Sequence, residues 1–253
     1  MKQFARLQKY WSGRCCIFCQ KYQLSRLSDG RAFCRFCNQR YSLSRLKREL
    51  TLLWYFALEI SAHRAAKETE YSYNTVRSAF MRFRQAIAGY EQQTHAHLAG
   101  QIELDESYFG GKRKGKRGRG AAGKVPVFGM LERNGTVFAI VVTDVSAPTL
   151  MNLVAKHTEK GSVYHTDTFR SYRSIHRYGK HFKIDHSKQF RNGASHINGL
   201  EGFWSYAKER FHKYHGVSKD HFFLYLKELE FRFNERQLNI FNLLVNIIFY
   251  SEF

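Results

Sequence analysis

The spacing of apolar residues divides the chain into a helical part and a later part of strands and helices. From residue 42 to about residue 93, apolar side chains recur every three or four positions, which predicts helices with one buried face. Ser61 is a candidate N-cap for a short helix, and a break at Tyr71 precedes the next helix. Two helices joined by a brief turn are typical of a helix-turn-helix, although any basic three-helix unit has the same pattern. The second helix carries cations that we expect to contact DNA: Arg77, Arg82 and Arg84.

After Gly100 the apolar period shortens to two, which indicates strands. The predicted strands cover residues 101–109, 125–131, 136–145, 161–166 and 181–185, with a hairpin turn at Asn134-Gly135. The predicted helices cover residues 148–157, 169–178, 195–215 and 222–233. Three antiparallel strands followed by alternating helices and strands describe an α/β (α+β) fold, an RNase H-like mixed sheet flanked by helices.

All five cysteines lie close together near the start of the chain. Four of them form two C-x2-C pairs, which are Cys16 with Cys19 and Cys34 with Cys37. Four thiolates at this spacing suit a tetrahedral structural Zn²⁺, and a disulfide framework is not expected in a reducing compartment. Asp29-Gly30 between the pairs predicts a hairpin turn, which gives the layout of a zinc ribbon. Cys15 has no assigned role.

The charge of the chain restricts the class of partner that it is expected to bind. Lys and Arg number 41 against 21 Asp and Glu, a net charge of +20. Such an excess usually faces a polyanion, and we expect double-stranded DNA. No apolar run reaches the ~20 residues of a membrane span, and the N-terminus lacks the apolar segment of a signal peptide. We therefore expect no membrane association and a cytoplasmic location beside the nucleoid.

A glycine-rich basic stretch, residues 110–120, connects the first two predicted strands. It contains no apolar residue, so it is predicted to be a loop that closes over DNA phosphates. The alternative is a loop that is merely solvated. Its six cations are Lys112, Arg113, Lys114, Lys116, Arg117 and Arg119.

Two aspartates occupy informative positions on the predicted sheet. Asp105 lies within the first strand, and Asp167 follows the end of the fourth. These strands are neighbours in an RNase H-like sheet, so the two carboxylates would meet, and a cation between them would relieve their repulsion. Oxygen ligands favour Mg²⁺ or Mn²⁺, and two such ions can activate a hydroxyl and stabilise the leaving oxygen of a phosphodiester. Glu103 and Glu106 flank Asp105, and we expect both to point to the opposite face unless a bulge turns Glu106 back.

A third ligand is expected from the long helix that begins near Ser195, its candidate N-cap. Glu201 lies in this helix, and Lys208 lies two turns later on the same face, where it can hold a phosphate. Asn198 shares that face one turn before Glu201 and can coordinate a metal through its carbonyl oxygen. The residue types leave both candidates open, and we favour Glu201 for its charge and its spacing to Lys208.

These residues resemble bacterial insertion-sequence transposases of the zinc-ribbon, ISXO-like group within the DDE superfamily. The resemblance is carried by the two cysteine pairs and by residues 103–112, 164–167 and 196–208. It implies a metal-dependent transposase in which Asp105 and Asp167 are the first two catalytic acids. The third position of this family is Asn or Glu followed by Lys, which fits Asn198 or Glu201 with Lys208.

The expected domain organisation is a zinc ribbon at 1–41, a helix-turn-helix-like segment at 42–98 and a catalytic domain with C-terminal helices at 99–253. The expected function is binding of an insertion sequence's ends, strand cleavage and strand transfer. Two ends must be brought together, so a homodimer or larger assembly is expected. The alternatives are a catalytically inactive DNA-binding regulator and an RNase H-like nuclease without strand transfer.

Overall fold

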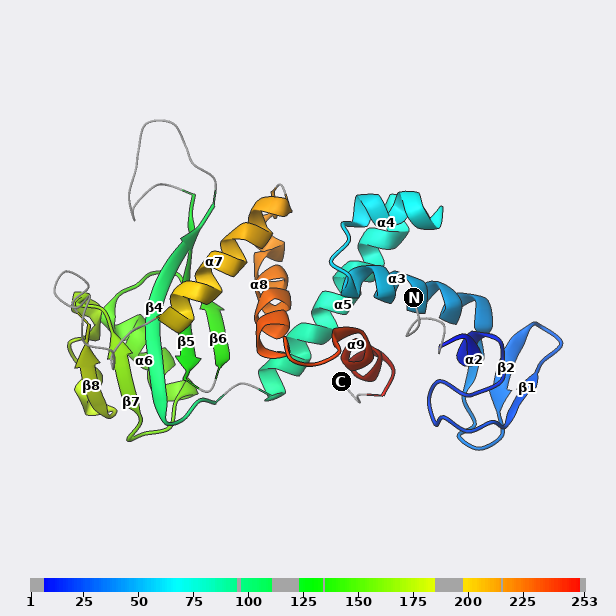
Figure 1. The fold of residues 1–253 in the computed structure, drawn as a ribbon, viewed down its shortest axis with the longest axis horizontal. Coiled ribbons are helices and arrows are strands. Elements are labelled where there is room, and N and C mark those ends of the chain that lie inside the picture. Colours follow the sequence, from blue (N-terminus) through cyan, green and yellow to red (C-terminus); the bar gives the residue numbers. More distant parts are fainter. Residues whose placement is uncertain are drawn as a thin grey trace. The chain divides into compact units, whose positions relative to one another are not determined.

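The computed structural model describes the chain as two compact units (Figure 1). Unit 1 consists of residues 1–87 and 237–253, and unit 2 of residues 88–236. The residues described are 7–94, 97–110, 123–133, 135–184, 198–214 and 216–250. The basic loop with its six cations and the candidate N-cap Ser195 lie outside these ranges. Among the described helices, none is long and apolar enough to cross a membrane.

Unit 1 begins with a short helix and a small antiparallel sheet. The helix is α2 (Gln8–Trp11), and the strands β1, β2 and β3, which pair in that order, cover Leu24–Arg26, Arg31–Cys34 and Arg40–Ser42. The β1–β2 turn forms where the sequence predicts it. Gly30 adopts a φ of +78°, and the Arg31 N–H donates to Asp29 Oδ1. The ribbon-like sheet is thus built around a turn that needs glycine.

Three helices follow the ribbon: α3 (Leu43–Ala57), α4 (Ala62–Thr69) and α5 (Tyr73–Thr94). Ser61 caps α4 as predicted, because its Oγ accepts the Arg64 N–H. Aromatic side chains contribute to the core of this unit, where the Phe56 ring meets the rings of Phe80 and Phe83 edge-on. The two helices joined by a brief turn are therefore present.

The last helix, α9 (Ile240–Phe249), packs against α3. The rings of Trp54 and Phe241 lie 5.0 Å apart, centroid to centroid. This helix belongs to unit 1, whereas the sequence groups it with the catalytic domain at 99–253. Apolar spacing shows that one helix face is buried, but it does not show which element buries it.

Unit 2 is built on a five-stranded mixed sheet with the order β6-β5-β4-β7-β8. The strands β4 to β8 cover Gln101–Phe109, Val125–Glu132, Thr136–Val141, Val163–Thr166 and Lys180–Lys183. β4, β5 and β6 are antiparallel neighbours, and β7 and β8 run parallel to β4. This is the RNase H-like arrangement that the sequence predicts.

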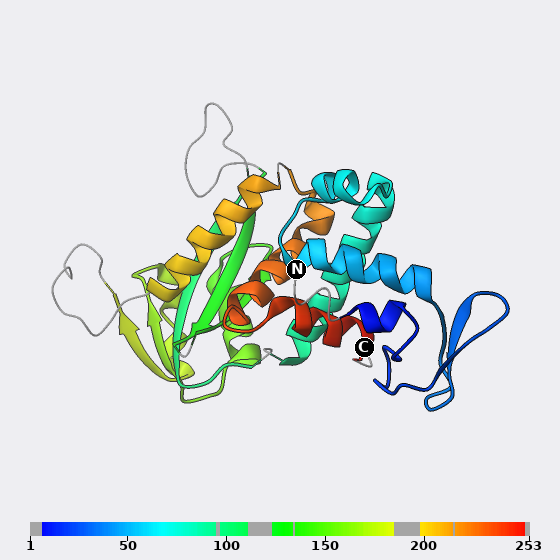
Figure 2. The ribbon, with the colours of Figure 1, turned by 45° about the vertical axis from the view of Figure 1, so that its right-hand side comes forward.

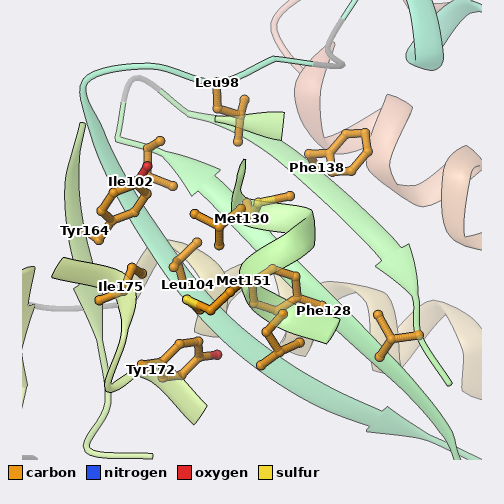
Figure 3. Packing of buried hydrophobic residues seen from close by; sticks show 13 residues of the cluster. Leu98, Ile102, Leu104, Phe128, Met130, Phe138, Met151, Tyr164, Tyr172 and Ile175 are labelled. Carbon is orange, nitrogen blue, oxygen red and sulfur yellow. The ribbon is translucent and has the colours of Figure 1, made fainter. Parts of the chain in front are cut away.

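Helices cover both faces of this sheet. α6 (Ala147–His157) covers one face, and α7 (Asn198–Lys213) and α8 (Lys219–Asn234) cover the other (Figures 1 and 2). Side chains of β4 alternate between the two faces. Ile102 and Leu104 join the core beneath α6 (Figure 3), and Phe109 joins the core beneath α7 and α8.

The segment 169–178, predicted as one helix, forms two 3₁₀ turns at Arg170–Tyr172 and Ile175–Arg177. Its apolar residues recur every three positions, at Phe169, Tyr172, Ile175 and Tyr178. A strict spacing of three matches the 3₁₀ helix, in which side chains three residues apart eclipse one another.

The outer strand β6 is capped by polar side chains of α8. Asn234 Oδ1 accepts the Val137 N–H at 2.8 Å, and Asn234 Nδ2 donates to the Val137 carbonyl at 3.0 Å. The Ala139 N–H donates to Glu230 Oε2, and the buried Lys227 donates to the same carboxylate. Capping of this kind protects an edge strand from pairing with another chain.

The variant Asn234→Ala is expected to lower the free energy of unfolding by about 2 kcal/mol or more, because it leaves the N–H and carbonyl of Val137 without these partners. The bond from Asn234 to Glu91 Oε2 is lost as well. Urea unfolding followed by circular dichroism measures the change. Asn152→Ala, which removes an exposed asparagine from α6, is the matched control and should unfold like the parent. Equal midpoints for the two variants would contradict the role of the cap.

Candidate functional site

Asp105 lies in the middle of β4, on the sheet face that α7 covers. Trp204 of α7 donates its Nε1–H to Asp105 Oδ2 at 3.0 Å. The pKa of Asp105 is raised to about 6, mainly by burial and additionally by the negative charges of Asp167 and Glu201. Hydrogen bonds from Trp204 and from the Glu106 backbone oppose this shift. A nearby cation would favour the ionised form of such a carboxyl group.

Asp167 follows β7 directly and stands beside Asp105. β7 runs parallel to β4, with Glu103 opposite His165. Continuing this register two residues beyond the last paired residues brings Asp167, which follows β7, level with Asp105. The Phe169 N–H donates to Asp167 Oδ1 at 2.8 Å, which holds this carboxylate at the strand end. The adjacency of the two strands, expected from the sequence, is confirmed.

α7 adds further polar groups over β4 and β5. Glu201 lies in its first turn and Lys208 two turns later, and both side chains are exposed. The negative charge of Glu201 makes a small contribution to the raised pKa of Asp105. Asn198 is the first residue of α7, but its side chain lies outside the described part of the structure.

The negative charges of Asp167 and Glu201 both contribute to the raised pKa of Asp105, after the larger effect of burial. Within the described ranges, the only group of three or more His, Cys, Asp or Glu side chains whose ligand atoms all lie within 4.8 Å of one another is formed by cysteines. The carboxylate oxygens of Asp105, Asp167 and Glu201 therefore do not all lie within 4.8 Å of one another. Their oxygen donors and the raised pKa of Asp105 fit a hard divalent cation such as Mg²⁺ or Mn²⁺.

The raised pKa of Asp105 predicts a pH dependence of stability. Between about pH 4 and pH 6 the folded, metal-free chain holds a proton that the unfolded chain releases, so stability falls as the pH rises through this window. Asp105→Asn is expected to raise the free energy of unfolding at pH 7.5 by about 1–2 kcal/mol, allowing for partial exposure, and to change it little at pH 4. Thermal unfolding without added divalent cations checks this. A variant that is destabilised at both pH values would rule it out.

The four cysteines of the two C-x2-C pairs converge in unit 1. Cys16, Cys19, Cys34 and Cys37 place their sulfurs within 4.8 Å of one another, with Cys16 Sγ 3.6 Å from Cys37 Sγ. Burial opposes ionisation of Cys34, but backbone N–H donors of Cys37 and Phe36 outweigh it, so the pKa of Cys34 is lowered to about 7. A thiolate held by backbone donors in a sulfur-lined cluster is compatible with Zn²⁺.

The three arginines expected to contact DNA through α5 have different surroundings. Arg77 is exposed. Arg82 is exposed as well, and its guanidinium donates to both carboxylate oxygens of Glu49, at 2.9 and 2.8 Å. Arg84 is only 6% exposed, and its guanidinium lies over the Phe56 ring. Because Arg84 is part of the core of unit 1, it is not placed to contact DNA in this fold, which corrects that expectation.

The two glutamates beside Asp105 lie on different faces. Glu106 points away from Asp105, as expected, and Tyr172 donates its hydroxyl to Glu106 Oε2 at 2.7 Å. Glu103 points to the same face as Asp105, which corrects the expectation, because side chains two residues apart in a strand share a face. Its Oε2 accepts the Leu200 N–H near the start of α7, at 3.1 Å.

Comparison with known proteins places the chain in a family. Residues 97–234 match a family model described as the ISXO2-like transposase domain. The chain belongs to this family of transposases. It is 40% identical over 103 residues to an uncharacterized transposase-like protein of Haemophilus influenzae, covering 40% of this chain and 84% of that protein. It is 27% identical over 202 residues to an uncharacterized protein in the transposable element ISH50 of Halobacterium salinarum, covering 72% of this chain and 67% of that protein.

Solved structures with a similar chain path include an integrase and a transposase. The catalytic core domain of BIV integrase matches with a TM-score of 0.36 and 15% identity, covering 56% of this chain and 86% of that chain. The Mos1 transposase paired-end complex with left transposon end matches with a TM-score of 0.27 and 12% identity, covering 74% and 76%. The fold class of this transposase rests on its own strand order and on the family match.

Two residues of this transposase site were missed by sequence reasoning. Trp204 was expected to be a core anchor, and it is buried, but its indole also binds Asp105. Glu103 was expected on the face opposite to Asp105, but it lies on the same face. The alternation of side chains along β4 was sufficient to find Glu103, whereas nothing in the sequence indicated the partner of the Trp204 N–H.

Proposed function

We propose that this transposase binds the ends of its insertion sequence, cleaves the DNA strand there and joins the freed end to target DNA. The observation that supports the proposal is that Asp105 lies in β4 and Asp167 directly follows the neighbouring parallel strand β7, with Glu201 on the helix α7 that packs on β4. Carboxylates gathered in this way are the ligand set for metal-dependent phosphodiester chemistry.

Asp105 and Asp167 would hold one or two Mg²⁺ or Mn²⁺ ions, with Glu201 or Asn198 as the third ligand. Bound there, the cations would supply Lewis-acid activation of the attacking hydroxyl and neutralise charge on the leaving oxygen. We favour Glu201, because its charge is within electrostatic reach of Asp105. The exposed Lys208 lies two turns from Glu201 and would hold a DNA phosphate beside the carboxylates.

The reaction would proceed in two steps at these same residues. A water molecule attacks the phosphodiester at the element's end and loses a proton to solvent; the phosphate stays on the 5′ side of the break, and the leaving 3′ oxygen takes up a proton to become a 3′ hydroxyl. That hydroxyl then attacks a phosphodiester of target DNA in line and loses its proton to solvent, while the displaced 3′ oxygen of the target takes up a proton. Asp105 and Asp167 orient the reacting groups in both steps, which removes much of the entropic cost of bringing them together.

DNA binding would come from both units. In unit 1, the exposed Arg77 and Arg82 of α5 and the ribbon with a structural Zn²⁺ at its four cysteines would recognise the element's ends. In unit 2, the six cations of residues 110–120 would contact phosphates near Asp105. A net charge of +20 supports a polyanionic partner and a location beside the nucleoid. Joining two ends would require a homodimer or a larger assembly.

The decisive experiment incubates the purified chain with DNA carrying the element's ends and a target duplex, with and without Mg²⁺ or Mn²⁺. Metal-dependent cleavage and joined products are expected. Binding without cleavage would instead establish an inactive regulator, and cleavage without joining would establish a nuclease. Either outcome would overturn the proposed function.

A further inference from the structure

Trp204 is placed between α7 and the sheet, directly against Asp105. Its side chain is 4% exposed, and its Nε1–H donates to Asp105 Oδ2 at 3.0 Å. The Phe109 ring meets the indole edge-on at 6.0 Å between centroids, and the Phe203 ring lies 5.1 Å away. The indole is therefore fixed by packing on its apolar side and by a hydrogen bond at its polar end.

Gly129 of β5 provides the space that the indole occupies. It is the residue opposite Asp105 in the β4–β5 pair. A Cβ at Gly129 would lie 2.5 Å from Trp204 Cζ2 and 2.7 Å from Trp204 Cη2, both ring atoms that cannot bend away. The absence of a side chain at this position thus allows the ring to lie against the sheet next to the carboxylate.

The start of α7 is held against the same strand by Glu103. Glu103 is 1% exposed, and its Oε2 accepts the Leu200 N–H at 3.1 Å. A Cβ at Gly199 would lie 2.9 Å from that oxygen, so the helix approaches the carboxylate as closely as glycine permits. A carboxylate at a helix N-terminus binds its unpaired N–H groups and its positive dipole end. This contact fixes the position of α7, and therefore that of Trp204, along β4.

We propose that Trp204 is a positioning residue for Asp105. The indole N–H occupies one lone-pair direction of Oδ2 and sets the orientation in which the carboxylate presents its remaining lone pairs to a divalent cation. The inference rests on the proposed function, since it assigns Asp105 as a metal ligand. Groups that orient a ligand in this way are typically worth about 10- to 100-fold in metal affinity.

The test uses Trp204→Phe in the zinc-loaded full chain, because phenylalanine keeps an aromatic ring at the site but has no N–H donor. Binding of Mn²⁺, followed by the electron paramagnetic resonance signal of the free ion, is expected to weaken by about 10- to 100-fold. Trp54→Phe is the matched control, because Trp54 packs on Phe241 in unit 1, and its Mn²⁺ affinity should equal that of the parent. Parent-like affinity in Trp204→Phe would overturn the proposal.

A second measurement does not depend on how Trp204→Phe folds. The indole N–H resonance of Trp204 is expected to move upfield in Asp105→Asn, because a neutral amide oxygen is a weaker acceptor than a carboxylate. An unchanged resonance would also overturn the proposal. The two failures are distinguishable: if Asp105→Asn still cleaves DNA, the proposed function of the site fails, whereas if it does not cleave and Trp204→Phe binds Mn²⁺ normally, only the role of Trp204 fails.

Discussion

Replacing Asp105 or Asp167 with asparagine is expected to reduce DNA strand cleavage by about 10³-fold or more in the presence of Mg²⁺. Each substitution removes one negative charge and one of the oxygen ligands that we propose, from Asp105 in β4 or from Asp167 directly after the neighbouring strand β7. Single-turnover cleavage of DNA carrying the element's ends measures the loss. Because we propose that both steps use the same carboxylates, strand transfer from pre-cleaved ends should fall in parallel.

Asp144→Asn is the matched control for this series. Asp144 is exposed before α6, where its carboxylate accepts the Ser146 N–H, and an asparagine oxygen can accept the same bond. This variant should cleave at the parental rate. Glu201→Gln is expected to lose more activity than Asn198→Ala, which would identify Glu201 as the third ligand. Parent-like cleavage by both aspartate variants would refute the carboxylate assignment.

Replacing Cys34 with serine is expected to abolish zinc binding and to unfold the ribbon. Structural zinc sites contribute about 10–16 kcal/mol of apparent binding free energy, far more than the small sheet β1-β2-β3 can supply by itself. Zinc content by mass spectrometry should fall from one ion per chain to none, and a protease should cut within residues 15–42. Binding to the element's ends should weaken at the same time.

The remaining cysteine provides the control for the zinc site. Cys15 is buried, its sulfur lies 3.7 Å from the Cys16 carbonyl oxygen, and it does not belong to the group of four converging sulfurs in the described residues. Cys15→Ala should therefore retain one zinc ion and the protease resistance of the parent. Loss of zinc from Cys15→Ala together with retention in Cys34→Ser would show that the ligand set is wrong.

The parts of the fold that follow local rules could be predicted from the sequence. The apolar period of two located the strands of unit 2, and the hairpin at Asp29-Gly30 formed where turn residues lay between the cysteine pairs. The position of Asp105 within a strand and of Asp167 directly after another could be predicted as well, and so could the order that makes these two strands neighbours. The 3₁₀ turns were missed, although a spacing of exclusively three residues was visible at 169–178.

Contacts that depend on how elements dock could not be predicted in the same way. The donor to Asp105 is Trp204, 99 residues away, and this pairing depends on the register between α7 and β4. The burial of Arg84 could have been predicted from the sequence, because Arg84 lies four residues after Phe80 and three before Ile87, both of which are buried. The charge of Arg84 favours an exposed position. The helical spacing predicts a buried one, and here the spacing is the stronger evidence.

The most direct test of the account is the position of the metal. Crystals of the zinc-loaded chain would be soaked in Mn²⁺, and anomalous diffraction would be recorded at the manganese absorption edge. We predict a manganese peak between the carboxylates of Asp105 and Asp167, close to Glu201, with zinc at the four cysteines. A chain that cleaves DNA with Mn²⁺ but binds the ion away from Asp105 and Asp167 would contradict the assignment of this site.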